Sequence, residues 1–202
     1  STRLSGTFAL LLAMLLAIVG VAFWQMGIMH TATQEITSNW LPAVERVNKM
    51  NTDASDLRIG EFQHVLNTDQ KAMEGVEKSM TDVLATFEGN HQAYVALISS
   101  DEERKLYDAF AGDWKQYLQI HETLLGVSRK NETEAATALL EGDSRKHYDR
   151  ASVTLLKLVE LNSLGGTAAA KDAATAYTTA RNSMFGAVAL VFMLVVAAAV
   201  WL

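Results

Sequence analysis

The chain has 202 residues, of which 50% are hydrophobic and 20% charged, and it contains no cysteine. No Asp, Glu, Lys or Arg occurs in the 31 residues 4–34 or in the 21 residues 182–202, whereas residues 35–181 hold 39 of the 40 charged residues and a net charge of −7. Two apolar ends around an acidic centre exclude a simple cytosolic globule, and the acidic centre argues against a nucleic-acid partner.

The N-terminal apolar stretch, residues 8–24, and the C-terminal stretch, residues 184–202, are each long enough to cross about 30 Å of hydrocarbon as a helix. We expect residues 1–29 and 184–202 to hold two transmembrane helices, with a cytoplasmic region following residue 202. A cleaved signal peptide is the alternative for the first stretch, but its apolar run exceeds the usual ~7–15 residues. Two crossings place residues 30–183 on one side of the membrane, which in a bacterium would be the periplasm.

Residues 30–183 are predicted to form four long helices, because apolar residues recur at alternating spacings of three and four and the chain has a single proline. This pattern is typical of the seam of a helical bundle. The expected seam positions are Val44, Val47, Asn51, Ala54, Arg58, Glu61 or Phe62 and Val65, then Met73, Val76, Met80, Val83, Phe87, Asn90, Tyr94 and Leu97, then Leu106, Phe110, Asp113, Tyr117, Ile120, Leu124 and Val127, and finally Tyr148, Ala151, Leu155, Leu158, Asn162 and Gly165. The predicted fold class is all-α, an up-down-up-down four-helix bundle flanked by two transmembrane helices.

Helix-capping residues mark the expected breaks. Ser100 with Glu103 forms a capping box, and Asn131 with Glu134 forms a second one that opens a short helix. Residues 67–69 are the expected turn between the first two helices of the bundle. Residues 142–144 are expected to end the short helix before the last helix begins.

Three stretches carry a family resemblance: Asn-Trp-Leu-Pro at 39–42, Leu-Arg-x-x-Glu-x-x-His at 57–64, and EAATALLEGD running into HYDRASVTLLKLVELN. With these stretches, the chain resembles the periplasmic sensing domain of bacterial chemoreceptors (methyl-accepting chemotaxis proteins) of the four-helix-bundle type. The resemblance implies a homodimer, a small-molecule attractant or repellent, and a cytoplasmic half with a HAMP linker and a signalling hairpin. A sensor histidine kinase with the same periplasmic module would look alike.

Arg58 is the residue we single out, because it occupies a seam position where the bundle requires an apolar side chain. A buried guanidinium left unpaired costs several kcal/mol, so an anionic group should meet it. That group is either a carboxylate of the bundle such as Glu61, with escape to solvent as a further option, or a ligand carboxylate held bidentately. The resemblance brings the ligand level with the bundle carboxylate as an interpretation, since aspartate-type receptors of this family present arginine from this part of the first helix.

Counting helical levels from the far turns of the bundle places further polar residues beside Arg58. Cations and hydroxyls together suit a small di- or tricarboxylate, because the charge holds it and the hydroxyls fix its orientation. The predicted ligand-binding set is Arg58, Thr81, Tyr117, His121, Tyr148, Arg150, Ser152 and Thr154. The alternatives are a core role for the two tyrosines and a solvated position for Arg150.

The motif Glu-x-x-His occurs twice, at residues 61–64 and 88–91, and a pair of such motifs holds two irons in some four-helix bundles. Level counting places the two motifs about 22 Å apart along the bundle, whereas paired metals lie ~4 Å apart. We therefore expect no metal and no cofactor. No P-loop, GxSxG or HExxH pattern occurs, and we expect no enzyme.

These observations predict the sensory region of a transmembrane chemoreceptor of the bacterial inner membrane. It would bind a small organic acid in the periplasm as a homodimer and signal through the fourth helix and the second span. The alternatives are the input domain of a sensor histidine kinase for an inorganic anion or a partner protein, and a ligandless membrane-anchored dimerisation module.

Overall fold

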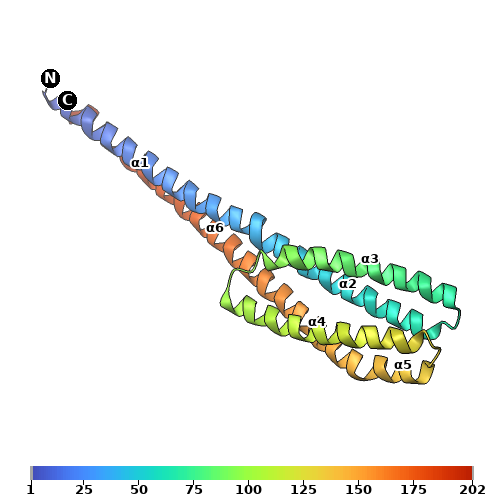
Figure 1. Ribbon diagram of the computed structural model, residues 1–202. Coiled ribbons are helices and arrows are strands. Elements are labelled where there is room, and N and C mark those ends of the chain that lie inside the picture. Colours follow the sequence, from blue (N-terminus) through green and yellow to red (C-terminus); the bar gives the residue numbers. More distant parts are fainter. Residues whose placement is uncertain (1, 202) are drawn as a thin grey trace. The chain divides into compact units, whose positions relative to one another are not determined.

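The computed structural model describes residues 2–201, and every regular element among them is helical. In chain order, the elements are α1 (Thr2–Glu35), the π-helical turn η1 (Ile36–Trp40), α2 (Leu41–Leu66), α3 (Gln70–Val95), α4 (Asp101–Ser128), α5 (Thr133–Leu139), a second π-helical turn η2 (Leu140–Ser144) and α6 (Arg145–Trp201) (Figure 1). The chain divides into two compact units, residues 39–165 and the flanking residues up to 38 and from 166.

The 39–165 unit is the predicted four-helix bundle, formed by α2, α3, α4 and the segment from α5 into the first part of α6. Its core consists of apolar side chains from all of these elements, including the fully buried Val47, Tyr94, Leu124 and Leu155. Aromatic rings join α3 to α4, because Phe87 stacks on Trp114 with ring centroids 4.3 Å apart.

The predicted seams agree with the burial on α3, where Met73, Met80, Phe87, Asn90 and Tyr94 are buried. On α4, four of the seven predicted positions are only half-buried: Leu106, Asp113, Ile120 and Val127. Beside three of them the next residue is buried instead, namely Trp114, His121 and Ser128. The buried stripe of α4 is therefore turned by one residue over this stretch.

The helix ends confirm three of the four predicted breaks and correct the fourth. Residues 67–69 separate α2 from α3, and Ser100 Oγ accepts the backbone N–H of Glu103 at 3.1 Å. The predicted cap at Asn131 is wrong: Glu132 occupies the N-cap position of α5 without a side-chain cap, and Asn131 has a φ of 58°. Asparagine is among the few residues that tolerate this left-handed conformation.

The predicted break at residues 142–144 is also confirmed. It lies in η2, where Gly142 has a non-helical φ of −89° and ψ of −114°. This residue separates the short helix α5 from α6, which begins at Arg145.

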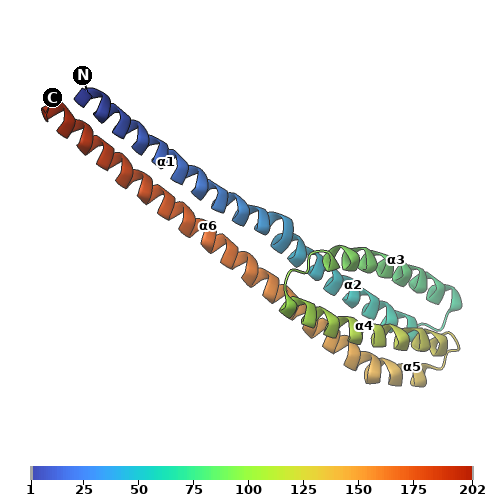
Figure 2. The same cartoon turned by 60° about the vertical axis from the view of Figure 1, so that its left-hand side comes forward.

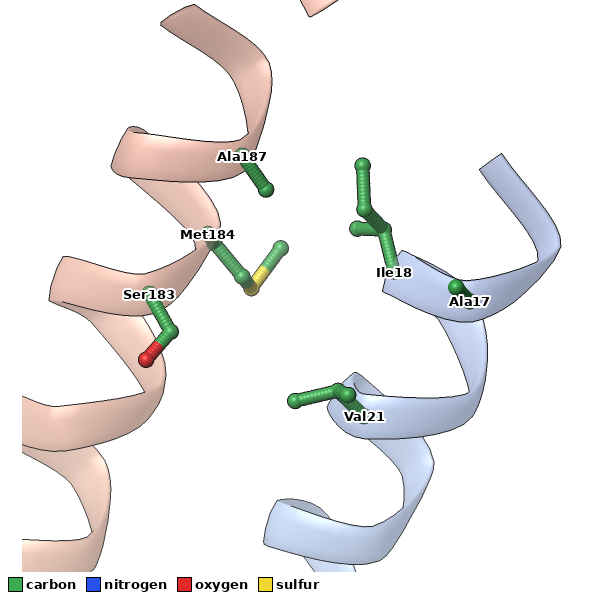
Figure 3. Close-up of a pocket in the computed structure, with 6 residues that line it drawn as sticks. All are labelled: Ala17, Ile18, Val21, Ser183, Met184 and Ala187. Carbon is green, nitrogen blue, oxygen red and sulfur yellow. The ribbon is translucent and has the colours of Figure 1, made fainter. Parts of the chain in front are cut away.

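In the second compact unit, α1 runs beside the C-terminal part of α6 (Figure 2). Both helices contain windows long and apolar enough to cross a membrane, and these windows are almost entirely exposed. A pocket of about 200 Å³ lies between them, lined by Ala17, Ile18, Val21, Ser183, Met184 and Ala187 (Figure 3). Such exposed apolar surface fits contact with lipid, and the exact extent of the spans stays a prediction.

Candidate functional site

Arg58 lies on α2 inside the bundle and is 7% exposed. Its Nη1 donates to Ser144 Oγ at 2.8 Å and to Glu61 Oε2 at 3.3 Å, and its Nη2 donates to the carbonyl oxygen of Leu140 at 2.8 Å. Leu140 and Ser144 are the first and last residues of η2. The irregular turn therefore supplies two of the acceptors around this cation, and Glu61 supplies the counter-charge, as one of the two sequence interpretations predicted.

Glu61 is fully buried and links two helices through its two carboxylate oxygens. Oε2 faces Arg58, three residues earlier on the same face of α2, and Oε1 lies 2.8 Å from His121 Nδ1 on α4. A buried carboxylate is tolerated when charge and hydrogen bonds both satisfy it. Arg58, Glu61 and His121 thus form one buried polar cluster, which we call the Arg58 cluster.

Tyr117 and Tyr148 border the Arg58 cluster with ring centroids 5.9 Å apart. Tyr117 is fully buried, and its hydroxyl has no hydrogen-bond partner among the described residues. Burial, together with the nearby charge of Glu61, raises the pKa of the Tyr117 hydroxyl. Tyr117 therefore brings a neutral hydroxyl donor to the edge of the cluster.

The guanidinium of Arg58 is covered on the side of α2 and α6 by two aromatic rings. Its Cζ lies 5.3 Å from the ring centre of Phe62 and 5.1 Å from that of Tyr148, distances at which a cation is attracted to a ring. Phe62 is 41% exposed, so Arg58 lies one side-chain layer below the surface. Tyr148 Oη and Ser55 Oγ are 3.0 Å apart beside this layer.

Ser152 belongs to the same face, because its Oγ donates to Asn51 Oδ1 at 3.1 Å one turn of α6 beyond Tyr148. The structure therefore brings four of the eight predicted residues together, Arg58, Tyr117, His121 and Tyr148, and places Ser152 one turn of α6 away from Tyr148.

The other three predicted residues lie elsewhere. Thr81 is exposed on α3 and donates to the backbone oxygen of Glu77. Arg150 is exposed, and its Nη1 lies 4.0 Å from Asp113 Oδ1. Thr154 donates to the backbone oxygen of Arg150. None of the three is brought to the Arg58 cluster.

A second polar cluster, which we call the Glu77 cluster, was not predicted. His64 on α2 is fully buried, with Nδ1 2.8 Å from Ser128 Oγ and Nε2 2.9 Å from Glu77 Oε1. Arg129 donates to both carboxylate oxygens of Glu77, at 2.7 and 2.9 Å. These hydrogen bonds, from Arg129 above all and also from His64, hold the pKa of Glu77 at about 2.

The sequence contained part of the signal for these two clusters. Arg58, Glu61 and His64 follow one another at spacings of three, which places all three on one face of α2. Their partners on α3, α4 and η2 are set by the packing of the helices, and the spacing of residues along α2 does not predict that packing. Among the residues described by the structure, no group of three or more His, Asp or Glu side chains is arranged to hold a metal ion.

Comparison with known proteins identifies the family of this chain. Residues 1–177 match the model of a family described as the four helix bundle sensory module for signal transduction. The chain is also 24% identical over 177 residues to the sensory transducer protein YvaQ of Bacillus subtilis (strain 168), an alignment that covers 88% of this chain and 31% of that relative. The chain thus spans about a third of the relative's length. With a helical bundle, two long apolar helices and this family match over most of its length, the chain belongs to the four-helix-bundle sensory modules of signal transduction.

Proposed function

We propose that the chain is the sensory region of a chemoreceptor-type transducer anchored in a bacterial inner membrane, with the bundle in the periplasm. The family match supports a role in sensing, and the two exposed apolar windows support the membrane anchor. Its role is to bind a signal molecule and to pass on a conformational change, without catalysis.

The proposed ligand is a small organic acid, and the Arg58 cluster is the observation that carries this proposal. Glu61 neutralises Arg58 inside a bundle that has a net negative charge. Arg58 Nη1 lies 3.3 Å from Glu61 Oε2, which is farther than the 2.8 Å between Arg58 Nη1 and Ser144 Oγ. A ligand carboxylate entering between Phe62 and Tyr148 would take the place of Glu61 on Arg58, while Glu61 keeps its bond to His121. Ser55, Tyr148 and Ser152 would then supply hydroxyls to orient a di- or tricarboxylate.

This exchange would supply the differential affinity that a sensor needs. A ligand shifts a conformational equilibrium only when it binds one of the two states more tightly. Releasing Glu61 from Arg58 would also loosen the contacts of Arg58 with η2, which leads directly into α6. We propose that α6, a single helix from Arg145 to Trp201, carries the change toward the membrane.

A homodimer is part of the proposal. Ile59, Phe62 and Leu66 recur at spacings of three and four on α2 and are 53%, 41% and 79% exposed. An apolar stripe of this kind next to the proposed site fits coverage by a second copy of the chain.

The test is a thermal-shift experiment on the whole chain in lipid nanodiscs, with succinate, malate, citrate and phosphate as probes. A ligand at about one hundred times its Kd stabilises the folded state by ~2.7 kcal/mol, which corresponds to a rise in Tm of roughly 5–10 °C for a chain of this size. We expect an organic acid to produce this rise in the wild type and in Arg145→Ala, which removes an exposed arginine.

Arg58→Met combined with Glu61→Gln removes both charges of the buried pair, and we expect this variant to lose the response. If no organic acid raised the Tm, both the proposed class of ligand and the proposed binding site would be contradicted. A rise that persisted in the double variant would place the binding site elsewhere, and a response to phosphate alone would favour the sensor-kinase alternative.

A further inference from the structure

Trp40 and Gly165 form a contact that leaves no room for a side chain on the glycine. A Cβ atom built on Gly165 would lie 2.5 Å from Cζ3, 2.6 Å from Cη2 and 2.7 Å from Cε3 of Trp40. Carbon atoms do not approach this closely without a clash, and the indole is a rigid ring that cannot bend away. The ring of Trp40 therefore rests directly on the backbone of α6.

The local sequence around Trp40 holds this ring in place. Trp40 is the last residue of the π-helical turn η1, and Pro42 fixes the backbone in the first turn of α2. The contact also lies at the edge of the bundle unit, since that unit begins at Asn39 and ends at Gly165. It is thus made where both α2 and α6 leave the bundle.

The contact extends the antiparallel packing of α2 against α6 along the bundle. Asn51 pairs with Ser152, and four residues farther along α2, Ser55 pairs with Tyr148, four residues back along α6. Trp40 lies 11 residues before Asn51, and Gly165 lies 13 residues beyond Ser152, so the contact is offset from this pairing by two residues, about 3 Å along α6. The large indole ring bridges this offset, and the antiparallel packing of α2 against α6 extends from the Arg58 cluster to Trp40.

On the face of α6 under the indole, Gly165 lies between residues that carry a Cβ. One turn away from Gly165 on either side are Leu161 and Ala169, both of which carry a Cβ. Three residues before Gly165, Asn162 donates to Glu103 Oε1 at 2.9 Å, which adds a polar attachment of α6 to α4.

We propose that Trp40 and Gly165 form a steric stop that fixes the axial position of α6 against α2 at the end of the bundle. One common class of helix movement in switching proteins is a shift of only about 1–2 Å. A displacement of this size would carry side-chain atoms of α6 toward the indole, so α6 moves only when the ring of Trp40 moves with it or turns away. The stop defines the resting position of α6 and requires no particular ligand.

Disulfide cross-linking of the whole chain in lipid nanodiscs tests this stop, and the absence of native cysteines leaves the background clean. Asn51→Cys with Ser152→Cys reports the native register, because the native side chains meet there. Ser55→Cys with Ser152→Cys reports displacement of α6 toward the next turn of α2. We expect the first pair to form a disulfide severalfold faster than the second.

Gly165→Ala should lower this ratio severalfold and reduce the Tm by several degrees. The matched control is Gly126→Ala, a helical glycine with open space around it, which should leave the ratio unchanged and keep or raise the Tm. In a Trp40→Ala background the added methyl group has room, so Gly165→Ala should then have no further effect on either quantity. The steric stop is ruled out if Gly165→Ala behaves like Gly126→Ala, or if its effects persist unchanged when Trp40 is alanine.

Discussion

Substituting Glu77 by glutamine removes the charge at the centre of the Glu77 cluster and should make the bundle less stable in a pH-dependent way. Arg129 donates to both oxygens of this carboxylate, and His64 Nε2 lies 2.9 Å from one of them. The ion pair with Arg129 is bidentate, the geometry in which an arginine and a carboxylate interact most strongly. Glutamine keeps the size of the side chain and loses the charge.

The pKa of Glu77 gives the size of the expected effect. A fall from 4.5 to about 2 corresponds to about 3 kcal/mol at 1.36 kcal/mol per pH unit. Because a quarter of the Glu77 side chain is exposed, solvent screening reduces this to roughly 2 kcal/mol. Since the pKa is lower in the folded state, the stabilisation is complete above about pH 4.5 and is lost as the pH falls toward 2.

The assay is urea unfolding of the whole chain in nanodiscs, followed by circular dichroism between pH 7 and pH 2. We expect Glu77→Gln to lose roughly 2 kcal/mol at pH 7 and to approach the wild type below pH 3. Glu74→Gln, on the exposed side of the same helix, should stay within about 0.5 kcal/mol throughout. A difference between wild type and Glu77→Gln that stayed constant down to pH 2 would refute an electrostatic origin.

Three further substitutions test other parts of the bundle by the same unfolding assay. Glu61→Ala should cost about 3–5 kcal/mol because Arg58 then stays buried without a counter-charge, and a loss below 1 kcal/mol would contradict this. Gly60→Ala should destabilise the bundle because its Cβ would lie 2.5 Å from Met80 Cγ, and Met80→Ala in the same chain should remove this extra cost. Ser100→Ala should cost about 1 kcal/mol by removing the N-cap of α4, and an unchanged free energy of unfolding would show that the cap contributes nothing.

The helical fold could be predicted because its signals are local and repeated. On α3 the spacing of Met73, Met80, Phe87 and Tyr94 is sufficient to define the buried stripe. On α4 the same reasoning placed Ile120 in the core in place of His121, because a histidine is expected at the surface unless its buried partner is known. The partner is Glu61, sixty residues away in the chain, and no local pattern contains it.

The site was partly predictable for a related reason. Arg58 could be identified because a charge on an apolar seam needs a partner, but the Leu140 carbonyl and the Ser144 hydroxyl lie in a turn that the sequence indicated as a break. Counting helical levels gives the height of a residue along the bundle and not the side it faces. For this reason Thr81 and Arg150 were predicted at the right level but lie away from Arg58.

The π-helical turn η2 has a consequence for how relatives of this chain can be compared. Gly142 has non-helical backbone angles there, so the relative position of Leu140 and Ser144 is set by the length of this break and not by a helical repeat. An insertion or deletion in residues 141–143 would shift Leu140 relative to Ser144 and withdraw an acceptor from Arg58. In a multiple alignment, a change in the length of this segment should therefore accompany the loss of arginine at position 58.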